Sequence, residues 1–511
     1  MKDVRVRFAP SPTGALHIGG VRTALYNYLL AKKHNGTLIL RIEDTDQSRF
    51  VPGAEAYIIE SLDWIGIKFD EGPSQGGPHA PYRQSERKTI YQQYADQLIQ
   101  SGHAYYAFDS EADLDAMRQK LKEQGSDHQQ YGPSTRMSMN NSLTRPGEEV
   151  QQRIKSGDPF VIRFKVPEAQ EIKLNDLIRG EVIVNSSQLD DKVLMKSDGL
   201  PTYHLANVVD DYLMKISHVI RGEEWLPSAP LHILLYQKLG WETEMPHFAH
   251  LPLLLKPDGN GKLSKRDADK LGFPIFPLTW TDPRTNERSE GFKERGYLPE
   301  ALANFLAFLG WNPGTEQEIF SIKQLIAAFE LPRINKAGAR FDIQKAEWYN
   351  QQYLRAKSNS ELVAYLNEVL SSEDLSCDPE KAELIVGILK ERITFPSDFL
   401  TAGRFFFEAP TQYDEKIAAK KWNDEIAGVL LEFGSKLKDQ SAVSAAKAKE
   451  LLEQVAANKG MAIGKLMQPL RLVITGGATG PDLMESIEIL GPDETSQRID
   501  HAVKALKVRS D

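Results

Sequence analysis

Hydrophobic and polar residues alternate over the first strand-like segment of the chain. In Val4-Arg5-Val6-Arg7-Phe8 every second position is apolar, so the pattern predicts a strand with one buried face over residues 3–9. Apolar residues then recur at helical spacing over residues 21–34, and a mostly apolar run follows at residues 37–43. This strand–helix–strand order is typical of a parallel α/β sheet.

The α/β pattern breaks off and resumes later in the chain. Residues 83–194 are rich in Gln, Ser and Asp and poor in apolar runs. Helix and strand patterns alternate again at residues 203–214, 218–221, 229–239 and 250–255. An inserted α+β domain that splits one sheet is the simplest interpretation. Beyond about residue 298 the pattern predicts almost only helices.

Composition indicates a multidomain enzyme. A chain of 511 residues is too long for one core, and 41% hydrophobic with 26% charged residues is ordinary for a globular protein. The single cysteine, Cys377, excludes an intrachain disulfide and a thiolate-rich metal cluster. No charged-then-apolar leader opens the sequence and no apolar run is long enough for a membrane span, so we expect a cytoplasmic protein without membrane attachment. The net charge of −9 still permits local docking of nucleic acid.

The segment His17-Ile18-Gly19-Gly20 lies between the first predicted strand and helix. Its glycines allow backbone to approach a ligand, and we expect unpaired N–H groups of the first helical turn to face an anion. A P-loop is excluded, because Gly20 and Val21 stand where that motif needs Lys and Ser or Thr. The segment therefore predicts a nucleotide site of another kind.

A second basic segment, Lys262-Leu263-Ser264-Lys265-Arg266, follows the flexible stretch Pro257-Asp258-Gly259-Asn260-Gly261. Two lysines and an arginine on a glycine-hinged loop suit a mobile clamp for a triphosphate. Together with His17-Ile18-Gly19-Gly20, this segment resembles the two signature sequences of the class I aminoacyl-tRNA synthetases. That resemblance implies that both segments bind ATP and stabilise the adenylation transition state.

Polar side chains cluster at the expected carboxyl ends of the strands, where an open parallel sheet binds its ligands. An acidic amino acid has two carboxylates and one ammonium, so its site needs positive donors, a counter-anion and neutral donors. The residues that supply this set are Arg7, Glu43, Tyr203, Asn207 and Arg221.

Longer motifs narrow the resemblance. The chain contains Arg7-Phe8-Ala9-Pro10-Ser11-Pro12-Thr13-Gly14 and Arg41-Ile42-Glu43-Asp44-Thr45-Asp46. It also contains Tyr203-His204-Leu205-Ala206-Asn207-Val208-Val209-Asp210-Asp211 and Val219-Ile220-Arg221-Gly222-Glu223-Glu224-Trp225. These motifs resemble those of the bacterial-type glutamyl-tRNA synthetases, closely from residue 3 to about residue 355 and more loosely to the end.

The resemblance implies a role for each matching residue. Arg7, Tyr203 and Arg221 would hold the side-chain carboxylate of glutamate, Ser11 and Asn207 the α-carboxylate region, and Glu43 the ammonium. The ATP site would comprise His17, Gly19, Gly20, Glu224, Lys262, Ser264, Lys265 and Arg266, with His17 and Lys265 the catalytic pair. The reaction would consume ATP with Mg²⁺ and pass through glutamyl-adenylate to the terminal ribose of tRNA(Glu).

The resemblance also implies five domains and a monomer. Residues 1–82 and 195–270 would form the two halves of a Rossmann-like class I sheet, and residues 83–194 the inserted domain that binds the acceptor end of tRNA. Residues 271–345 would contact the stem, and residues 346–511 would form an all-α region that binds the anticodon.

Two features depart from the family pattern. Some bacterial relatives hold zinc in the inserted domain through a Cys-x-Cys pair, whereas this chain has Ala107-Phe108-Asp109 there. Because Asp109 and His128 alone make a poor structural site, we predict no zinc. The stretch of residues 273–295 is an apparent insertion, which we interpret as a surface loop.

Two alternatives remain at this stage. A glutaminyl-tRNA synthetase would share the ATP signatures but should lack an arginine at position 221 and should end in β-barrels instead of helices. An inactive or regulatory tRNA-binding relative is disfavoured by the presence of His17, Glu43, Arg221 and Lys265.

Overall fold

A computed structural model describes residues 3–126 and 129–507 of the chain. The chain divides into two compact units, each described here by itself. One unit contains Met1–Arg295 and Pro299–Ala346, and the other contains Gly296–Leu298 and Glu347–Asp511.

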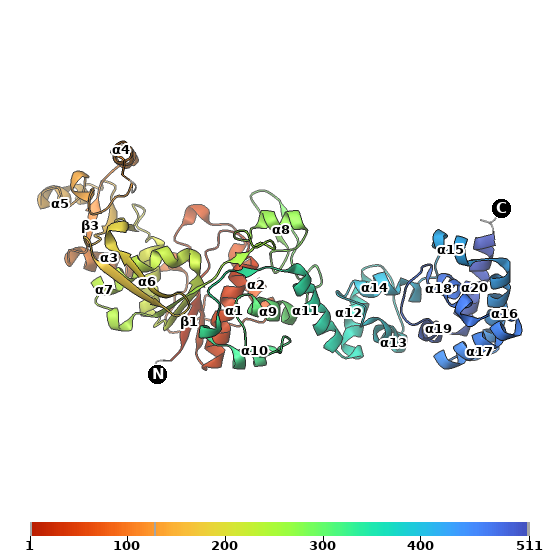
Figure 1. Cartoon of the computed structure of the whole chain (residues 1–511). Helices are drawn as coiled ribbons and strands as arrows, with labels where there is room; N and C mark the ends of the chain where they lie inside the picture. The colour runs from red at the N-terminus through yellow and green to blue at the C-terminus, as the bar shows by residue number, and fades with distance from the viewer. Residues whose placement is uncertain (1–2, 127–128, 508–511) are drawn as a thin grey trace. The chain divides into compact units, whose positions relative to one another are not determined.

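The first unit is built on a two-stranded parallel sheet and a four-stranded mixed sheet, with helices packed around them (Figure 1). Its strands are β1 (Arg5–Phe8), β2 (Thr37–Leu40), β5 (Glu171–Asp176), β6 (Gly180–Asn185), β8 (His218–Gly222) and β9 (His247–Leu251). β1 pairs with β2 and β8 with β9, both in parallel, while β5 joins β9 in parallel and β6 in antiparallel direction. β1 and β8 lie side by side, and the backbone N–H of Ser217 donates to the carbonyl of Arg5 at 2.8 Å. The predicted interrupted parallel sheet is confirmed.

Helices flank these strands. They are α1 (Ile18–Lys33), α2 (Ala54–Trp64), α6 (Tyr203–Leu213) and α7 (Ala229–Lys238). α1 packs against β1, β2 and β8, and its apolar residues are buried along most of its length. The turn from α1 into β2 requires glycine at Gly36, because a Cβ atom there would lie 2.1 Å from the carbonyl oxygen of Val4.

The segment of residues 83–194 contains both helices and strands. Its elements besides β5 and β6 are α3 (Lys88–Gln100), β3 (Ala104–Ala107), α4 (Glu111–Glu123), α5 (Gly147–Lys155), β4 (Val161–Phe164) and β7 (Val193–Met195). β3, β4 and β7 form an antiparallel sheet. Buried residues of α3, β4, β5 and β7 share one hydrophobic core with α6, α7 and β8. The core is therefore continuous from this segment into the second half of the sheet.

The chain from residue 252 to 346, apart from Gly296–Leu298, completes the first unit. Its elements are β10 (Leu254–Leu255), α8 (Lys265–Leu271), β11 (Trp280–Thr281), β12 (Arg288–Ser289), α9 (Pro299–Phe308), α10 (Ile322–Ala328), β13 (Ala339–Arg340) and the start of α11 (Ile343–Ala356). The strand predicted at residues 250–255 is split into β9 and β10 at Pro252, which has no N–H for a ladder.

The interpretation of residues 273–295 as a surface loop is wrong in part. Phe273, Phe276, Leu278 and Phe292 are buried, whereas most of the short hairpin of β11 and β12 and residues 293–295 are exposed. Large aromatic side chains stabilise the fold when they leave water, so both ends of this segment pack inward.

The second unit consists of helices. After α11 these are α12 (Asn359–Ser371), α13 (Pro379–Leu389), α14 (Asp398–Gly403), α15 (Glu415–Lys421), α16 (Asp424–Lys438), α17 (Ala445–Asn458), α18 (Ile463–Thr475), α19 (Leu483–Leu490) and α20 (Pro492–Lys507). α16 packs against α17, α18 and α20. The helical C-terminal region predicted from the apolar spacing is confirmed.

Candidate active site

A hollow of about 470 Å³, here called the central pocket, opens at the carboxyl ends of β1, β2 and β8. Eleven of the fourteen residues predicted to bind substrates line it. They are Arg7, Ser11, His17, Gly19, Gly20, Glu43, Tyr203, Asn207, Arg221, Glu224 and Lys262. Chain segments separated by up to about 250 positions thus meet in one cavity, as expected for the edge of a parallel sheet.

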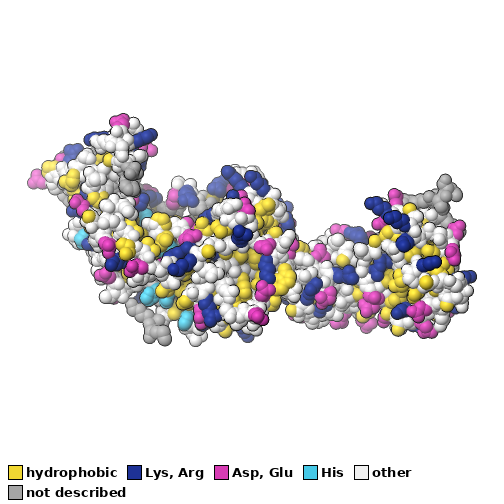
Figure 2. Space-filling model, viewed as in Figure 1, with side chains coloured by type: hydrophobic (Ala, Val, Ile, Leu, Met, Phe, Trp, Pro, Cys, Tyr) yellow, Lys and Arg dark blue, Asp and Glu magenta, His cyan; other side chains and the backbone are white. Residues whose placement is uncertain are grey.

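The other three predicted residues, Ser264, Lys265 and Arg266, do not line the central pocket. Ser264 is the N-cap of α8, and its hydroxyl accepts from the backbone N–H of Asp267. Lys265 forms an ion pair at 2.9 Å with Glu287, in the hairpin between β11 and β12. Figure 2 shows Lys and Arg side chains gathered over the region of α8. The loop therefore places Lys262 in the pocket and keeps Lys265 outside.

His17 is the N-cap residue of α1, so the helix begins three residues earlier than the apolar spacing predicts. Its Nδ1 accepts from the backbone N–H of Gly19 at 3.0 Å. Partial desolvation in the hollow and repulsion from Lys262 lower the pKa of His17 below 6.5, so the ring is neutral at pH 7. A neutral ring that accepts at Nδ1 carries its proton on Nε2 and can donate it.

Glycine is needed at position 19 because of this histidine. A Cβ atom on Gly19 would lie 2.7 Å from Cε1 of His17, and one on Gly20 would lie 2.4 Å from Cδ1 of Leu16. Glycine at position 19 therefore leaves room for the imidazole at the N-terminus of α1, and glycine at position 20 leaves room for Leu16.

The expectation that the first turn of α1 offers unpaired N–H groups is wrong. The N–H of Ile18 donates to the carbonyl of Ile275 at 3.0 Å, that of Gly19 to His17 Nδ1, and that of Gly20 to the carbonyl of His17. Capping and the inward packing of residue 275 satisfy these donors. The imidazole of His17 is a side-chain donor at this end of the pocket, with Lys262 near it.

Arg221, at the end of β8, is buried among neutral partners. Its Nη1 donates to the hydroxyl of Tyr203 at 2.6 Å and its Nε to Nε2 of His250 at 3.0 Å. The Nη2 group reaches only the carbonyl of Trp225, at 3.4 Å. No carboxylate in the described part of the chain forms an ion pair with Arg221.

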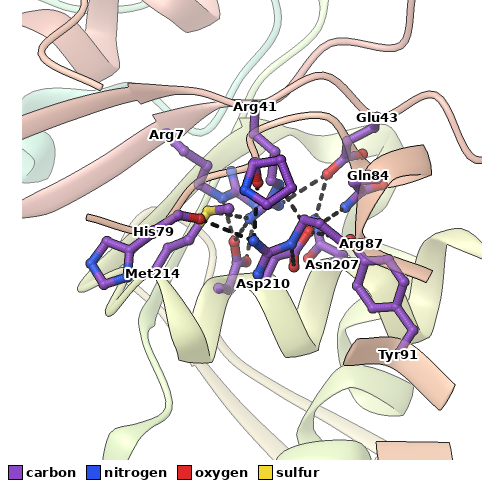
Figure 3. A network of polar contacts seen from close by, with 12 residues as sticks. Arg7, Arg41, Glu43, His79, Gln84, Arg87, Tyr91, Asn207, Asp210 and Met214 are labelled. Carbon is purple, nitrogen blue, oxygen red and sulfur yellow. Dashed lines mark hydrogen bonds and ion pairs between the residues drawn. The ribbon is translucent and has the colours of Figure 1, made fainter. Parts of the chain in front are cut away.

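A buried network of charges includes Arg7, Glu43 and Asn207 of the central pocket (Figure 3). Arg7 contacts both carboxylate oxygens of Asp211, at 3.0 and 3.2 Å, and Arg41 donates to the same carboxylate at 2.7 Å. Arg41 and Asn207 also donate to Glu43, at 3.0 and 3.1 Å. Burial raises the pKa of Glu43, although Arg41 opposes the shift.

Two more pairs extend this network. Arg87 donates to Asp210 at 2.7 Å, and Nε of Arg41 lies 3.9 Å from the same residue. Gln84 and Tyr91 complete the hydrogen bonds of Asp210, at 3.0 and 2.8 Å. The hydrogen bonds of this network hold the side chains of Arg7 and Glu43 in place.

Sequence reasoning missed several residues of this site. Arg41, Asp211 and His250 hold the predicted residues in place, and Trp225 packs on Tyr203 with ring centroids 4.5 Å apart. Arg41, Asp211 and Trp225 lie within motifs already identified, so only the partners of their side chains were unpredictable. His250 gave no sequence signal beyond its place in an apolar run.

The residues considered for zinc do not form a metal site in the described part of the chain. Asp109 accepts from the hydroxyl of Tyr131 at 3.0 Å and the N–H of Asn140 at 2.7 Å. His128 lies outside the described residues. Among the described residues no group of three or more His, Cys, Asp or Glu could hold a metal ion. The absence of zinc stays a prediction.

Comparison with known proteins defines the class. The model of the class I tRNA synthetase (E and Q) catalytic domain matches residues 3–348, and an anticodon binding domain model matches residues 354–503. The central pocket and interrupted parallel sheet lie within the first match. The fold is that of a class I aminoacyl-tRNA synthetase.

Full-length relatives narrow the class to a family. The chain is 59% identical to a glutamate–tRNA ligase of Cytophaga hutchinsonii, over 99% of this chain and 98% of that protein. It is 58% identical to one of Amoebophilus asiaticus, over 99% of both chains. A crystal structure of a glutamate tRNA ligase from Elizabethkingia meningosepticum, in complex with its amino acid, matches at 50% identity and a TM-score of 0.96, covering 99% of this chain and 100% of that one. The chain belongs to the glutamate–tRNA ligase family, which confirms the resemblance and does not favour the glutaminyl alternative.

No described helix combines the length and apolar character that crossing a membrane requires.

Proposed function

We propose that the central pocket binds glutamate at its Arg221 end and ATP with Mg²⁺ at its His17 end, and joins them as glutamyl-adenylate. The α-carboxylate of glutamate attacks the α-phosphorus of ATP, and pyrophosphate leaves. The terminal ribose hydroxyl of tRNA then attacks the activated carbonyl, and AMP leaves. The protein contributes positioning and charge stabilisation, since it forms no covalent intermediate.

The charge balance of the pocket is the observation that carries this proposal. In the network beneath it, three arginines (Arg7, Arg41 and Arg87) oppose three carboxylates (Glu43, Asp210 and Asp211). Arg221 lies outside this balance, because its partners are an imidazole, a hydroxyl and a carbonyl. Arg221 thus offers a buried positive charge without a carboxylate partner, which matches the negative charge of the glutamate side chain.

Glutamine is disfavoured by the same balance. Its amide would leave the buried guanidinium of Arg221 without a counter-charge, and an uncompensated buried charge costs about 3–5 kcal/mol. The ammonium of either amino acid would lie against Glu43, and its α-carboxylate region near Ser11 and Asn207. The hydroxyl of Tyr203 would form a hydrogen bond with the ligand beside Arg221. Only Nη1 of Arg7 would be available to the ligand, since Nε and Nη2 bind Asp211.

ATP would lie against Gly19 and Gly20, with the Nε2–H of His17 donating to the nucleotide. Lys262 would leave Glu224, which it contacts at 3.2 Å, to pair with a phosphate. Lys265 and Arg266 would close on the other phosphates after Lys265 leaves Glu287, and Ser264 would cap the loop in that position. Mg²⁺ would enter with the phosphates of ATP, as that ion usually does, with few carboxylates of its own.

The remaining assignments follow the family. Residues 1–82 and 195–270 would carry the chemistry, residues 83–194 would bind the acceptor end of tRNA(Glu), and residues 271–345 the stem. Residues 346–511 would bind the anticodon. We propose a cytoplasmic monomer.

Pyrophosphate exchange tests this function. The unmodified chain is incubated with ATP, labelled pyrophosphate, tRNA and either glutamate or glutamine, and the same assay is repeated without tRNA. Exchange that depends on glutamate supports the proposal. Equal exchange with both amino acids, or none with either, would contradict it.

A further inference from the structure

Arg221 is held from behind by a buried pair of side chains, Asp176 and His250. Nε of Arg221 lies 3.0 Å from Nε2 of His250, and Nδ1 of His250 lies 2.6 Å from Oδ2 of Asp176. The exposed fractions of Arg221, His250 and Asp176 are 6%, 0% and 4%. None of the glutamate-binding or ATP-binding roles uses Asp176 or His250.

Only one assignment of donors and acceptors fits the hydrogen bonds that link Arg221, His250 and Asp176. The Nε of an arginine always carries a proton, so Nε2 of His250 must accept with its lone pair. Burial lowers the pKa of His250 despite the opposing effect of Asp176, so the ring is neutral at pH 7. Its one proton is therefore on Nδ1, which donates to Asp176.

Asp176 itself is fixed by the backbone. At the end of β5, its Oδ1 accepts from the N–H groups of Ile178 and Arg179, both at 2.9 Å, and its Oδ2 accepts from that of His250 at 3.1 Å. These bonds hold its pKa below the usual value although burial opposes ionisation. A permanent acceptor thus faces Nδ1 of His250 and selects the tautomer.

We propose that Asp176 and His250 are positioning residues that orient Arg221 for the side-chain carboxylate of glutamate. This inference rests on the proposed role of Arg221. With Nε held by His250 and Nη1 by Tyr203, the guanidinium plane cannot rotate, and Nη2 has only a weak carbonyl partner. Bidentate recognition of a carboxylate depends on that plane, because the donor fork of arginine is rigid.

The arrangement also connects two distant segments of the sequence. Asp176 belongs to β5, inside the stretch of residues 83–194, and His250 belongs to β9. The two strands meet in parallel at Asp176 and Phe248. The hairpin of β5 and β6 therefore contributes directly to the orientation of the arginine that reads the amino acid.

Two substitutions of His250 separate its two hydrogen bonds. In His250→Asn the amide can still donate to Asp176 but presents no acceptor to Arg221, whereas the longer His250→Gln can place an amide oxygen near the position of Nε2. We expect His250→Asn to raise the KM for glutamate about 10- to 100-fold, the loss of one hydrogen bond to a charged group. The rise in His250→Gln should be several-fold smaller.

Steady-state aminoacylation with the full chain and tRNA measures these effects. The kcat and the KM for ATP should change less than about threefold in both variants, because the loss concerns ground-state and transition-state binding of glutamate equally. His247→Asn, on the same strand with an exposed side chain, is the matched control and should behave as the unmodified chain. Equal KM values for glutamate in His250→Asn and His250→Gln, or an equal rise for ATP, would overturn the inference.

Arg221→Gln in the same series separates this inference from the proposed function. If Arg221→Gln raises the KM for glutamate and His250→Asn does not, the pocket assignment stands and the positioning role fails. If neither does, the assignment of the pocket itself fails.

A measurement on the unmodified chain covers the case in which His250→Asn does not fold. Nitrogen-15 spectra of histidine-labelled protein should show His250 at neutral pH with a protonated Nδ1 and a bare Nε2, assigned by its loss in His250→Gln. A protonated Nε2 would overturn the inference, since it cannot accept from Arg221.

Discussion

Replacing Arg221 by glutamine should remove most of the preference of this enzyme for glutamate over glutamine. Arg221→Gln keeps a polar side chain near the end of β8 that can still reach the hydroxyl of Tyr203, but it removes a buried guanidinium that has no carboxylate partner. The network of Arg7 and Asp211 is untouched, so the fold and the rest of the pocket should persist.

The size of the effect follows from the charges. Two unit charges about 4 Å apart interact by about 4 kcal/mol at an effective dielectric constant of about 20. This corresponds to about 1000-fold in kcat/KM for glutamate, at about 1.4 kcal/mol for each factor of ten. Glutamine loses one hydrogen bond from a charged donor, about 1.5–3 kcal/mol or about 10- to 100-fold. The preference for glutamate should therefore fall about 10- to 100-fold.

Pyrophosphate exchange with saturating ATP and tRNA measures kcat/KM for both amino acids in both proteins. Thermal unfolding of Arg221→Gln provides the control for folding, and the KM for ATP the control for the nucleotide end of the pocket. A folded variant that keeps the preference of the unmodified chain would refute the charge balance as the basis of selectivity.

Four further outcomes follow from the same structure. Gly19→Ala should raise the KM for ATP about 2- to 10-fold in exchange assays, because its Cβ forces His17 off its rotamer; an unchanged KM would show that the ring has no role. Lys265→Ala should slow adenylate formation about 10²–10³-fold in single-turnover measurements, and Glu287→Gln should change it less than about fivefold, since an exposed ion pair is weak. Burial would raise the pKa of Asp211, but its arginine partners outweigh burial and hold that pKa below 3.8. The contribution of Asp211 to stability is therefore complete above pH 3.8, and it is lost as the pH falls through the lower pKa of the folded state. At pH 7 the free energy of unfolding in urea should therefore be larger for the unmodified chain than for Asp211→Asn, and this difference should shrink in acid. A difference that grew in acid would contradict this prediction. Elemental analysis of protein purified without chelators should find no stoichiometric zinc, and one zinc per chain would overturn that prediction.

Much of the pocket could be predicted because its residues follow strands whose pattern is local. Alternation around Arg7 and the apolar run before Arg221 predict β1 and β8, and parallel strands bring their carboxyl ends together. That these side chains lie close together could therefore be predicted without knowledge of the tertiary packing.

The residues that hold the pocket in place could not be predicted in the same way. Asp211 joins Arg7 and Arg41 across more than 160 positions of the chain, and Asp176 meets His250 through a strand hidden in a polar segment. β5 buries one face and exposes the other, so its composition appears polar. Such pairs depend on tertiary packing, which leaves no periodic signal.

The different positions of Lys262 and Lys265, at the two ends of the basic loop, could also not be predicted from the sequence. The charge pattern of Lys262 and Lys265 suggests one clamp, but the capping box of Ser264 starts α8 between them and turns Lys265 toward Glu287. Local capping chemistry thus separates two lysines that lie three positions apart.

A crystal structure of the chain with bound glutamate tests most directly whether the guanidinium of Arg221 binds the side chain of the amino acid. The side-chain carboxylate should lie about 3 Å from Nη2 of Arg221, in a charge-assisted hydrogen bond, with Tyr203 beside it and the ammonium against Glu43. A carboxylate bound elsewhere in the pocket, with Nη2 of Arg221 left to the carbonyl of Trp225, would contradict the proposed basis of recognition.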